Sequence, residues 1–71
     1  MKEMPAIRLA AARVNAGLTQ DMVSNELRVS KNTIVAWENG KQEPKISQAR
    51  ALSKLYKIPL DYLIFLPRES N

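Results

Sequence analysis

The fold is decided by the stretch from Leu18 to Gly40, which reads LTQDMVSNELRVSKNTIVAWENG. Thr19 and Ser30 each precede a helix-compatible run, and a hydroxyl at such a position can accept a hydrogen bond from an unpaired N–H group of the first helical turn. Gly40 supplies a left-handed stop for the second run, and Pro44 prevents its continuation. The stretch therefore predicts two short helices in succession, each with a defined start.

Apolar residues recur along both helices at helical spacing. Val23 and Leu27 share one face of the first helix, and Ile34 and Trp37 share one face of the second. Residues 27–29 leave only about three positions in which the chain can reverse direction. Since that is too few for helices lying side by side, we expect the two helices to cross steeply and to pack through these stripes.

The outer face of the second helix carries polar and small side chains. With the apolar stripe turned inward, the solvent side presents Lys31, Asn32, Val35, Ala36 and Asn39. In a DNA major groove the lysine can donate to guanine acceptors, the asparagine can bond adenine in bidentate fashion, and Val35 or Ala36 can rest against a thymine methyl. Thr33, in the first turn, is better placed for a phosphate. The set predicts a base-reading helix, although each residue alone also suits an ordinary solvated helix face.

The length and composition predict one small domain over residues 1–71, with a core over about 5–66 and a frayed tail over 67–71. Eleven Lys and Arg residues against seven Asp and Glu residues give a net charge of +4, which is compatible with a polyanionic partner without identifying one. No run approaches the ~18 apolar residues of a membrane span, and Arg8 and Arg13 interrupt the stretch that a secretory signal would need. We therefore expect a cytoplasmic protein with no membrane partner.

Catalytic and metal-binding chemistry has few candidates. The chain contains no cysteine and no histidine, so it has neither a disulfide framework nor a thiolate ligand set. No two carboxylates sit at a spacing that suggests an acid–base pair. Gly17 and Gly40 are the two glycines of the chain, which excludes a glycine-rich phosphate loop. We expect no catalytic site, no metal site and no cofactor.

The flanking segments also predict helices. Pro5 suits the first turn of a helix over about 6–16, whose buried stripe comprises Leu9, Ala12, Arg13 and Ala16. A helix opening at 44–46 and running to about Tyr56 has on its inner face Ile46, Ala49, Leu52, Ser53 and Tyr56. Pro59 starts a short last helix that ends at about Phe65. Since no pattern indicates a β-strand, we expect an all-α fold of five short helices.

Arg13 stands within an apolar stripe, an unusual place for a charge. A buried guanidinium needs a carboxylate, and Glu38, next to the inward-facing Trp37, is the candidate with a fixed helical position. The arginine can equally extend to solvent along its methylene groups. Spacing alone leaves both interpretations open.

These residues resemble the phage-repressor (Cro-type, Xre-like) helix-turn-helix family over roughly residues 7–65. The motifs that carry the resemblance are Arg13, Gly17-Leu18-Thr19-Gln20, Val29-Ser30, Ile34, Trp37-Glu38-Asn39-Gly40, Pro44 and Ile58-Pro59-Leu60-Asp61-Tyr62-Leu63. The resemblance implies a compact five-helix lambda-repressor-like domain. It further implies a sequence-specific transcriptional regulator, expected to be a repressor, that binds a near-palindromic operator in double-stranded DNA as a homodimer, with helix 30–39 in the major groove.

The resemblance also implies roles for single residues. Positions where the family reads bases are occupied by Lys31, Asn32 and Ala36. Positions of its phosphate contacts are occupied by Gln20 and Asn39. Family precedent favours the ion pair between Arg13 and Glu38 over the solvent-extended arginine.

Two positions depart from the family's pattern. Arg28 stands where the family usually has glycine, since the turn between the helices calls for a left-handed backbone that costs a residue with a Cβ ~1 kcal/mol or more. Arg28, like Lys41, can instead gain a phosphate contact. Ser24 replaces the usual alanine where the two helices cross, and its hydroxyl can bond the carbonyl one turn back.

The apolar run from Tyr62 to Pro67 exceeds what a short last helix can bury. We expect a two-fold dimer contact at Leu60, Tyr62, Ile64 and Phe65, with residues 41–45 as the alternative surface. The run can also fold back over the first helix and complete the core. It further supports a second functional reading, an antitoxin-like or adaptor module that binds a regulatory protein partner and for which DNA binding is secondary.

Overall fold

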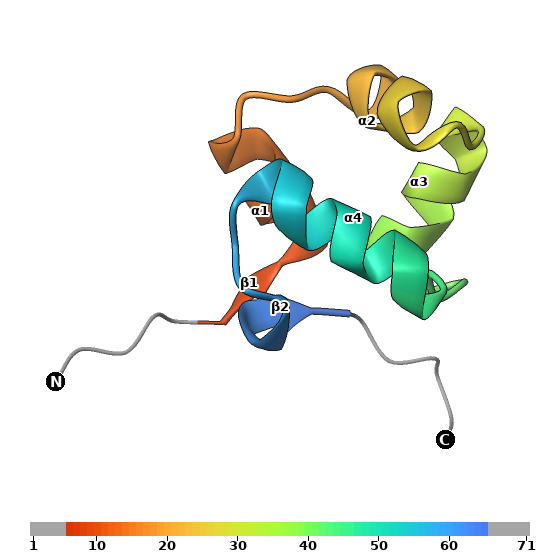
Figure 1. Ribbon diagram of the computed structural model, residues 1–71. Coiled ribbons are helices and arrows are strands. Elements are labelled where there is room, and N and C mark those ends of the chain that lie inside the picture. Colours follow the sequence, from red (N-terminus) through yellow and green to blue (C-terminus); the bar gives the residue numbers. More distant parts are fainter. Residues whose placement is uncertain (1–5, 66–71) are drawn as a thin grey trace, which may run out of the picture.

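The computed structural model describes residues 6–65 of the chain (Figure 1). These residues contain four α-helices, one 3-10 turn and two short strands. In chain order they are β1 (Ile7–Arg8), α1 (Leu9–Asn15), α2 (Gln20–Leu27), α3 (Lys31–Asn39), α4 (Ile46–Tyr56), the 3-10 turn η1 (Leu60–Tyr62) and β2 (Leu63–Ile64). The all-α helix-turn-helix class is confirmed, with one helix fewer than expected.

The two predicted helix caps are present. The Thr19 hydroxyl accepts a hydrogen bond from the Met22 N–H at 3.1 Å, and the Ser30 hydroxyl accepts one from the Thr33 N–H at 3.1 Å. Each bond satisfies one of the orphan N–H groups of a helix start. At the other end of α3, Gly40 adopts a left-handed backbone with φ of 80° and stops the helix.

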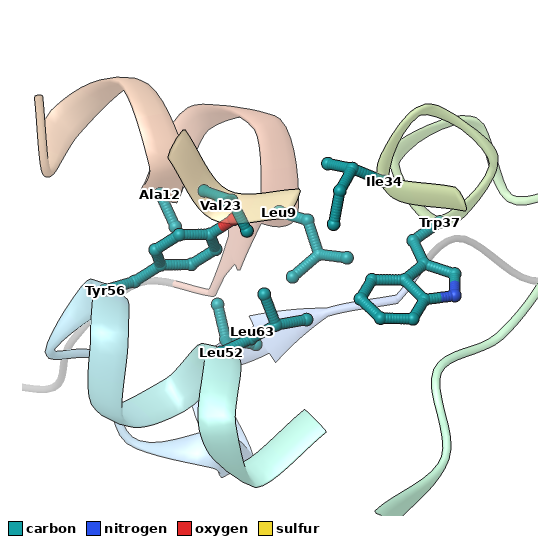
Figure 2. Close-up of a cluster of buried hydrophobic side chains, with 8 residues drawn as sticks. All are labelled: Leu9, Ala12, Val23, Ile34, Trp37, Leu52, Tyr56 and Leu63. Carbon is teal, nitrogen blue, oxygen red and sulfur yellow. The ribbon is translucent and has the colours of Figure 1, made fainter. Parts of the chain in front are cut away.

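The core gathers one apolar face from every helix and from β2 (Figure 2). Its buried members are Leu9, Ala12, Val23, Ile34, Trp37, Leu52, Tyr56 and Leu63. In the close-up, the Trp37 ring from α3 lies at one side of the cluster, next to Leu63 and Leu9, and Leu52 lies beyond Leu63 (Figure 2). The stripes predicted for the two central helices therefore do pack inward, and α1 and α4 hold them from the opposite side.

The predicted fifth helix is wrong. After one 3-10 turn the backbone at Leu63 becomes extended, with φ of −83° and ψ of 129°, and β2 pairs in parallel with β1. The register places Ile7 opposite Leu63 and Arg8 opposite Ile64. The expectation of no strands fails for the same reason: the β1–β2 pair satisfies backbone groups of two segments that are distant in the chain. Neither two-residue segment carries a strand signal by itself.

The first helix is shorter than predicted. It starts at Leu9 rather than near Pro5, because residues 7–8 are used in the strand pair, and it ends at Asn15. Ala16 is exposed rather than part of the buried stripe. Pro5, the end of the apolar run at Leu66 and Pro67, and the predicted tail over 67–71 lie outside the described residues.

The inner face predicted for α4 is correct except at its first residue. Ala49, Leu52 and Tyr56 are buried, whereas Ile46 is 66% exposed. The helical spacing that includes Ile46 continues one turn beyond the point where neighbouring elements cover α4. Ile46 therefore lies on the surface as a large apolar side chain.

Candidate nucleic-acid interface

The turn between α2 and α3 has the strained backbone that the family resemblance implied. Arg28 ends α2 in the left-handed region, with φ of 61° and ψ of 43°, and the Val29 N–H donates to the Ser24 carbonyl at 3.0 Å. The buried Ser24 hydroxyl donates to the Asp21 carbonyl at 2.8 Å, which confirms the expected bond one turn back. This turn sets the crossing of the two helices and leaves the exposed Arg28 side chain at their junction.

A polar network fastens the first turn of α2 to the last turn of α3. Arg13 Nε donates to Glu38 Oε2 at 2.7 Å, Arg13 Nη2 donates to Glu38 Oε1 at 3.3 Å, and Gln20 Nε2 donates to the same Oε1 at 3.0 Å. Arg13 Nη1 also donates to the Leu18 carbonyl at 3.0 Å. The side chains of Arg13 and Glu38 are only 15% and 6% exposed, so the structure forms the ion pair inside the domain rather than extending the arginine to solvent.

Burial and charge around this network shift two pKa values. The hydrogen bond to Glu38 raises the pKa of Arg13 despite partial desolvation of the guanidinium. Desolvation, followed by the nearby charge of Glu38, raises the pKa of the Tyr56 phenol to about 12, while Arg13 acts in the opposite direction. Across the physiological pH range Arg13 therefore stays charged and Tyr56 stays neutral.

The residues predicted to read bases lie along α3 with unequal exposure. Lys31 and Asn32, in the first turn, are exposed, whereas Val35 and Ala36 are half-buried. A long polar side chain at the helix start can reach a base edge more readily than a half-buried methyl group one turn later. Among these four residues, those at the N-terminal end of α3 are therefore the more exposed.

The residues predicted to contact phosphates divide by what they already bind. Arg28, Asn39 and Lys41 are exposed. Gln20 uses its amide nitrogen toward Glu38, which leaves the second N–H of that group for an anion. The Thr33 hydroxyl lies 3.0 Å from the Ser30 hydroxyl, so part of its hydrogen-bonding capacity is used at the N-terminus of α3.

One charged neighbour of the predicted base-reading residues could not be found from the sequence. Lys31 Nζ lies 4.0 Å from Asp21 Oδ1, and the two side chains are 55% and 70% exposed. Asp21 looks like an ordinary first-turn acid of α2, a position that the helix dipole favours. No local pattern reports its proximity to α3, because the contact depends on how the two helices cross.

The residues predicted for the dimer contact are only partly brought together. Leu60 and Phe65 line an apolar groove of about 260 Å³ together with Glu43, Pro44, Ile46 and Ala49. Tyr62 and Ile64 are half-buried and lie outside this lining. The groove thus joins part of the predicted contact to residues of the alternative surface at 41–45.

Two features are absent from residues 6–65, a group of metal-ligating side chains and a membrane-spanning helix. Over that range no group of three or more His, Cys, Asp or Glu side chains could hold a metal ion. In the same range no helix is both long and apolar enough to cross a membrane.

Comparison with known proteins gives a consistent family. A family model described as a helix-turn-helix domain matches residues 6–69. The cryptic phage CTXphi transcriptional repressor RstR of Vibrio cholerae is 40% identical over 52 residues, which are 73% of this chain and 47% of the relative. No solved structure gives a significant match.

Two further relatives carry different regulatory names. The transcriptional activator BcrR of Enterococcus faecalis is 32% identical over 57 residues, which are 80% of this chain and 28% of the relative. The transcriptional regulator ImmR of Bacillus subtilis strain 168 is 33% identical over 57 residues, which are 80% of this chain and 45% of the relative. The chain spans less than half the length of each of these relatives.

Proposed function

Since the chain belongs to the helix-turn-helix domain family, we propose that it is a sequence-specific DNA-binding regulator of transcription, and specifically a repressor. The observation that carries the proposal is the exposed, polar start of α3, where Lys31 and Asn32 project beside a helix crossing fixed by the left-handed turn at Arg28. A rigid helix presenting such donors and acceptors suits the major groove of B-form DNA. Repression is favoured over activation by the name of the relative with 40% identity.

In this proposal, one set of residues contacts bases and another set contacts phosphates. Asn32 bonds adenine, Lys31 donates to guanine, and Val35 and Ala36 contact thymine methyl groups at the edge of the reading surface. Phosphates are bound by Gln20, Arg28, Thr33, Asn39 and Lys41. The Arg13–Glu38 pair supports this division, because it holds Gln20 in register with α3.

Asn32→Ala is expected to weaken binding to the cognate site by about 1–3 kcal/mol and to leave binding to random duplex unchanged, because the bidentate bond to adenine is lost while phosphate contacts remain. The cognate site is first obtained by selecting bound sequences from a random library with the wild-type chain. Affinities are then measured by fluorescence anisotropy on the selected and a scrambled duplex.

The matched control for this measurement is Asn25→Ala, which removes an exposed asparagine from α2 instead of α3. It should bind both duplexes like the wild type. Equal affinity of Asn32→Ala and wild type for the selected site would remove Asn32 from the reading role. A wild-type chain that enriches no sequence would overturn the proposed function itself.

The proposal includes a dimer on DNA. One recognition helix covers about four base pairs, so two subunits are required about one DNA turn, roughly 34 Å, apart on a near-palindromic operator. The groove lined by Pro44, Ile46, Leu60 and Phe65 is the surface we assign to the two-fold contact. It is apolar, it contains the 66% exposed Ile46, and none of its lining residues belongs to α3.

Ile46→Asp is expected to weaken binding to the full operator by about 10- to 100-fold and to leave binding to a half-site unchanged, since a charge in the contact prevents the second subunit from docking. Ile46 is the first residue of α4, where a carboxylate is compatible with the helix dipole, so the subunit should remain folded. Gel shifts on full and half sites measure both effects.

Ser47→Asp provides the matched control, because it adds the same charge at the next position, on an exposed residue outside the groove. It should retain tight binding to the full site. If Ile46→Asp binds the full site as tightly as Ser47→Asp does, the dimer contact lies on another surface.

The exposed groove also favours one other function, a module that binds a different protein, in the manner of an antitoxin or adaptor. The library selection separates the two candidates. Enrichment of a palindromic sequence supports the regulator, whereas absence of enrichment supports the protein-binding module.

A further inference from the structure

A carboxylate lies beside the proposed base-reading residues. Asp21 is the second residue of α2, Lys31 is the first residue of α3, and Asp21 Oδ1 lies 4.0 Å from Lys31 Nζ. This separation is within the range of an ion pair but too long for a direct hydrogen bond. The carboxylate therefore attracts the ammonium group while leaving its three N–H donors free.

A negative charge at this place works against general DNA binding. It repels phosphates, and it offsets the charge of Lys31, so the pair as a whole neutralises no phosphate and releases no counterion. Arg13–Glu38 and Asp21–Lys31 are the two salt bridges of residues 6–65, and the first of them is largely buried. The exposed pair is thus placed where it reduces affinity for DNA of any sequence.

We propose that Asp21 is a specificity-determining residue, which keeps the Lys31 ammonium beside the start of α3 and away from phosphates. The inference rests on the proposed function, since it concerns whether Lys31 contacts a base edge or a phosphate of bound DNA. Asp21 itself does not read a base; it acts through Lys31 as a positioning residue.

The flexibility of lysine makes such positioning effective. A long unbranched side chain can reach either a phosphate or a base edge from the same Cα, and a phosphate contact carries no sequence information. In water, two opposite charges at 4 Å attract by an energy equivalent to about a fivefold change in an equilibrium constant. The guanine O6 and N7 atoms can accept from the free N–H groups with the pair intact, whereas a swing to a phosphate breaks the pair. Asp21 therefore penalises the sequence-independent contact more than the specific one.

Asp21→Asn tests the inference, because it keeps the size of the side chain and removes its charge. We expect affinity for random duplex to rise about five- to tenfold at low salt, and the slope of log affinity against log salt to steepen by about one. Library selection with the variant should show a relaxed preference at one base-pair position. That position should be the same one that Lys31→Ala relaxes.

Two further variants separate positioning from simple repulsion. Glu26→Gln removes the same charge from the same helix at an exposed residue for which residues 6–65 show no salt bridge, so it should leave the sequence preference unchanged. In a Lys31→Ala background, Asp21→Asn should produce no additional change in preference. If Asp21→Asn and Glu26→Gln strengthen binding to cognate and random duplex by the same factor, with preferences intact, the inference is overturned.

The outcome also distinguishes this inference from the function on which it rests. A wild-type chain that enriches no sequence overturns both. A wild-type chain that enriches a sequence, together with an Asp21→Asn variant of unchanged preference, overturns only the role of Asp21. Thermal unfolding of Asp21→Asn should match the wild type within a few degrees, since the lost helix-dipole interaction at an exposed position is small.

Discussion

Trp37→Ala is expected to lower the free energy of unfolding by about 3–5 kcal/mol, which would leave a domain of this size largely unfolded. Trp37 is 3% exposed and contributes the largest side chain of the buried cluster (Figure 2). Removing the indole leaves a cavity between α3 and the elements that pack on it, and a small core cannot collapse enough to fill it. Urea denaturation followed by circular dichroism measures the loss without relying on tryptophan fluorescence.

Val14→Ala is the comparison variant for this prediction. Val14 is also a helical apolar residue but is 62% exposed, so its truncation should change the free energy of unfolding by no more than about 0.5 kcal/mol. A loss below about 1 kcal/mol for Trp37→Ala would show that the indole does not support the core.

Glu38→Ala is expected to cost about 3–5 kcal/mol, because it leaves the mostly buried Arg13 guanidinium without its carboxylate. It also removes the acceptor of the Gln20 amide. Arg13→Ala should destabilise the domain to a similar extent, because it leaves the Glu38 carboxylate without its cation. The double variant should lose clearly less than the sum of the two single losses, which chemical denaturation of all four proteins measures as a double-mutant cycle.

Gln20→Ala is the control within the same network. It removes one hydrogen bond to Glu38 and leaves the ion pair intact, so its cost should be about 1 kcal/mol. Additive losses in the Arg13–Glu38 cycle would contradict the coupling, and the guanidinium would then be stabilised mainly by its contact with the Leu18 carbonyl.

Local rules predicted the central part of the fold. Thr19 and Ser30 cap the helices that they were expected to cap, and Gly40 ends α3 with a positive φ. The left-handed backbone at Arg28 was expected from the resemblance to the helix-turn-helix family, which usually has glycine at this position. By contrast, the second non-glycine residue with positive φ, Lys57 at the end of α4, was not anticipated. There the Ser53 hydroxyl donates to the Ile58 carbonyl at 2.6 Å and stabilises the bend.

Whether a feature of the functional surface could be predicted depended on how far apart in the chain its residues lie. The exposure of Lys31 and Asn32 could be derived from helical periodicity, since the buried positions of α3 define its opposite face. The Asp21–Lys31 pair could not, because it joins two helices. The groove beside Ile46 could not either, because residues from α4, the loop before it and the C-terminal segment form it jointly.

The sequence by itself determined the two central helices, their caps and their inward stripes, because each of these depends on residues within about one or two turns of one another. The tertiary structure alone decided the rest. It turned the expected last helix into a 3-10 turn and a strand, because Leu63 and Ile64 find backbone partners in residues 7–8. It also showed that Arg13 forms the ion pair with Glu38, 25 positions away in the chain, rather than extending to solvent. Contacts across such separations depend on how whole elements pack, and no local spacing encodes that packing.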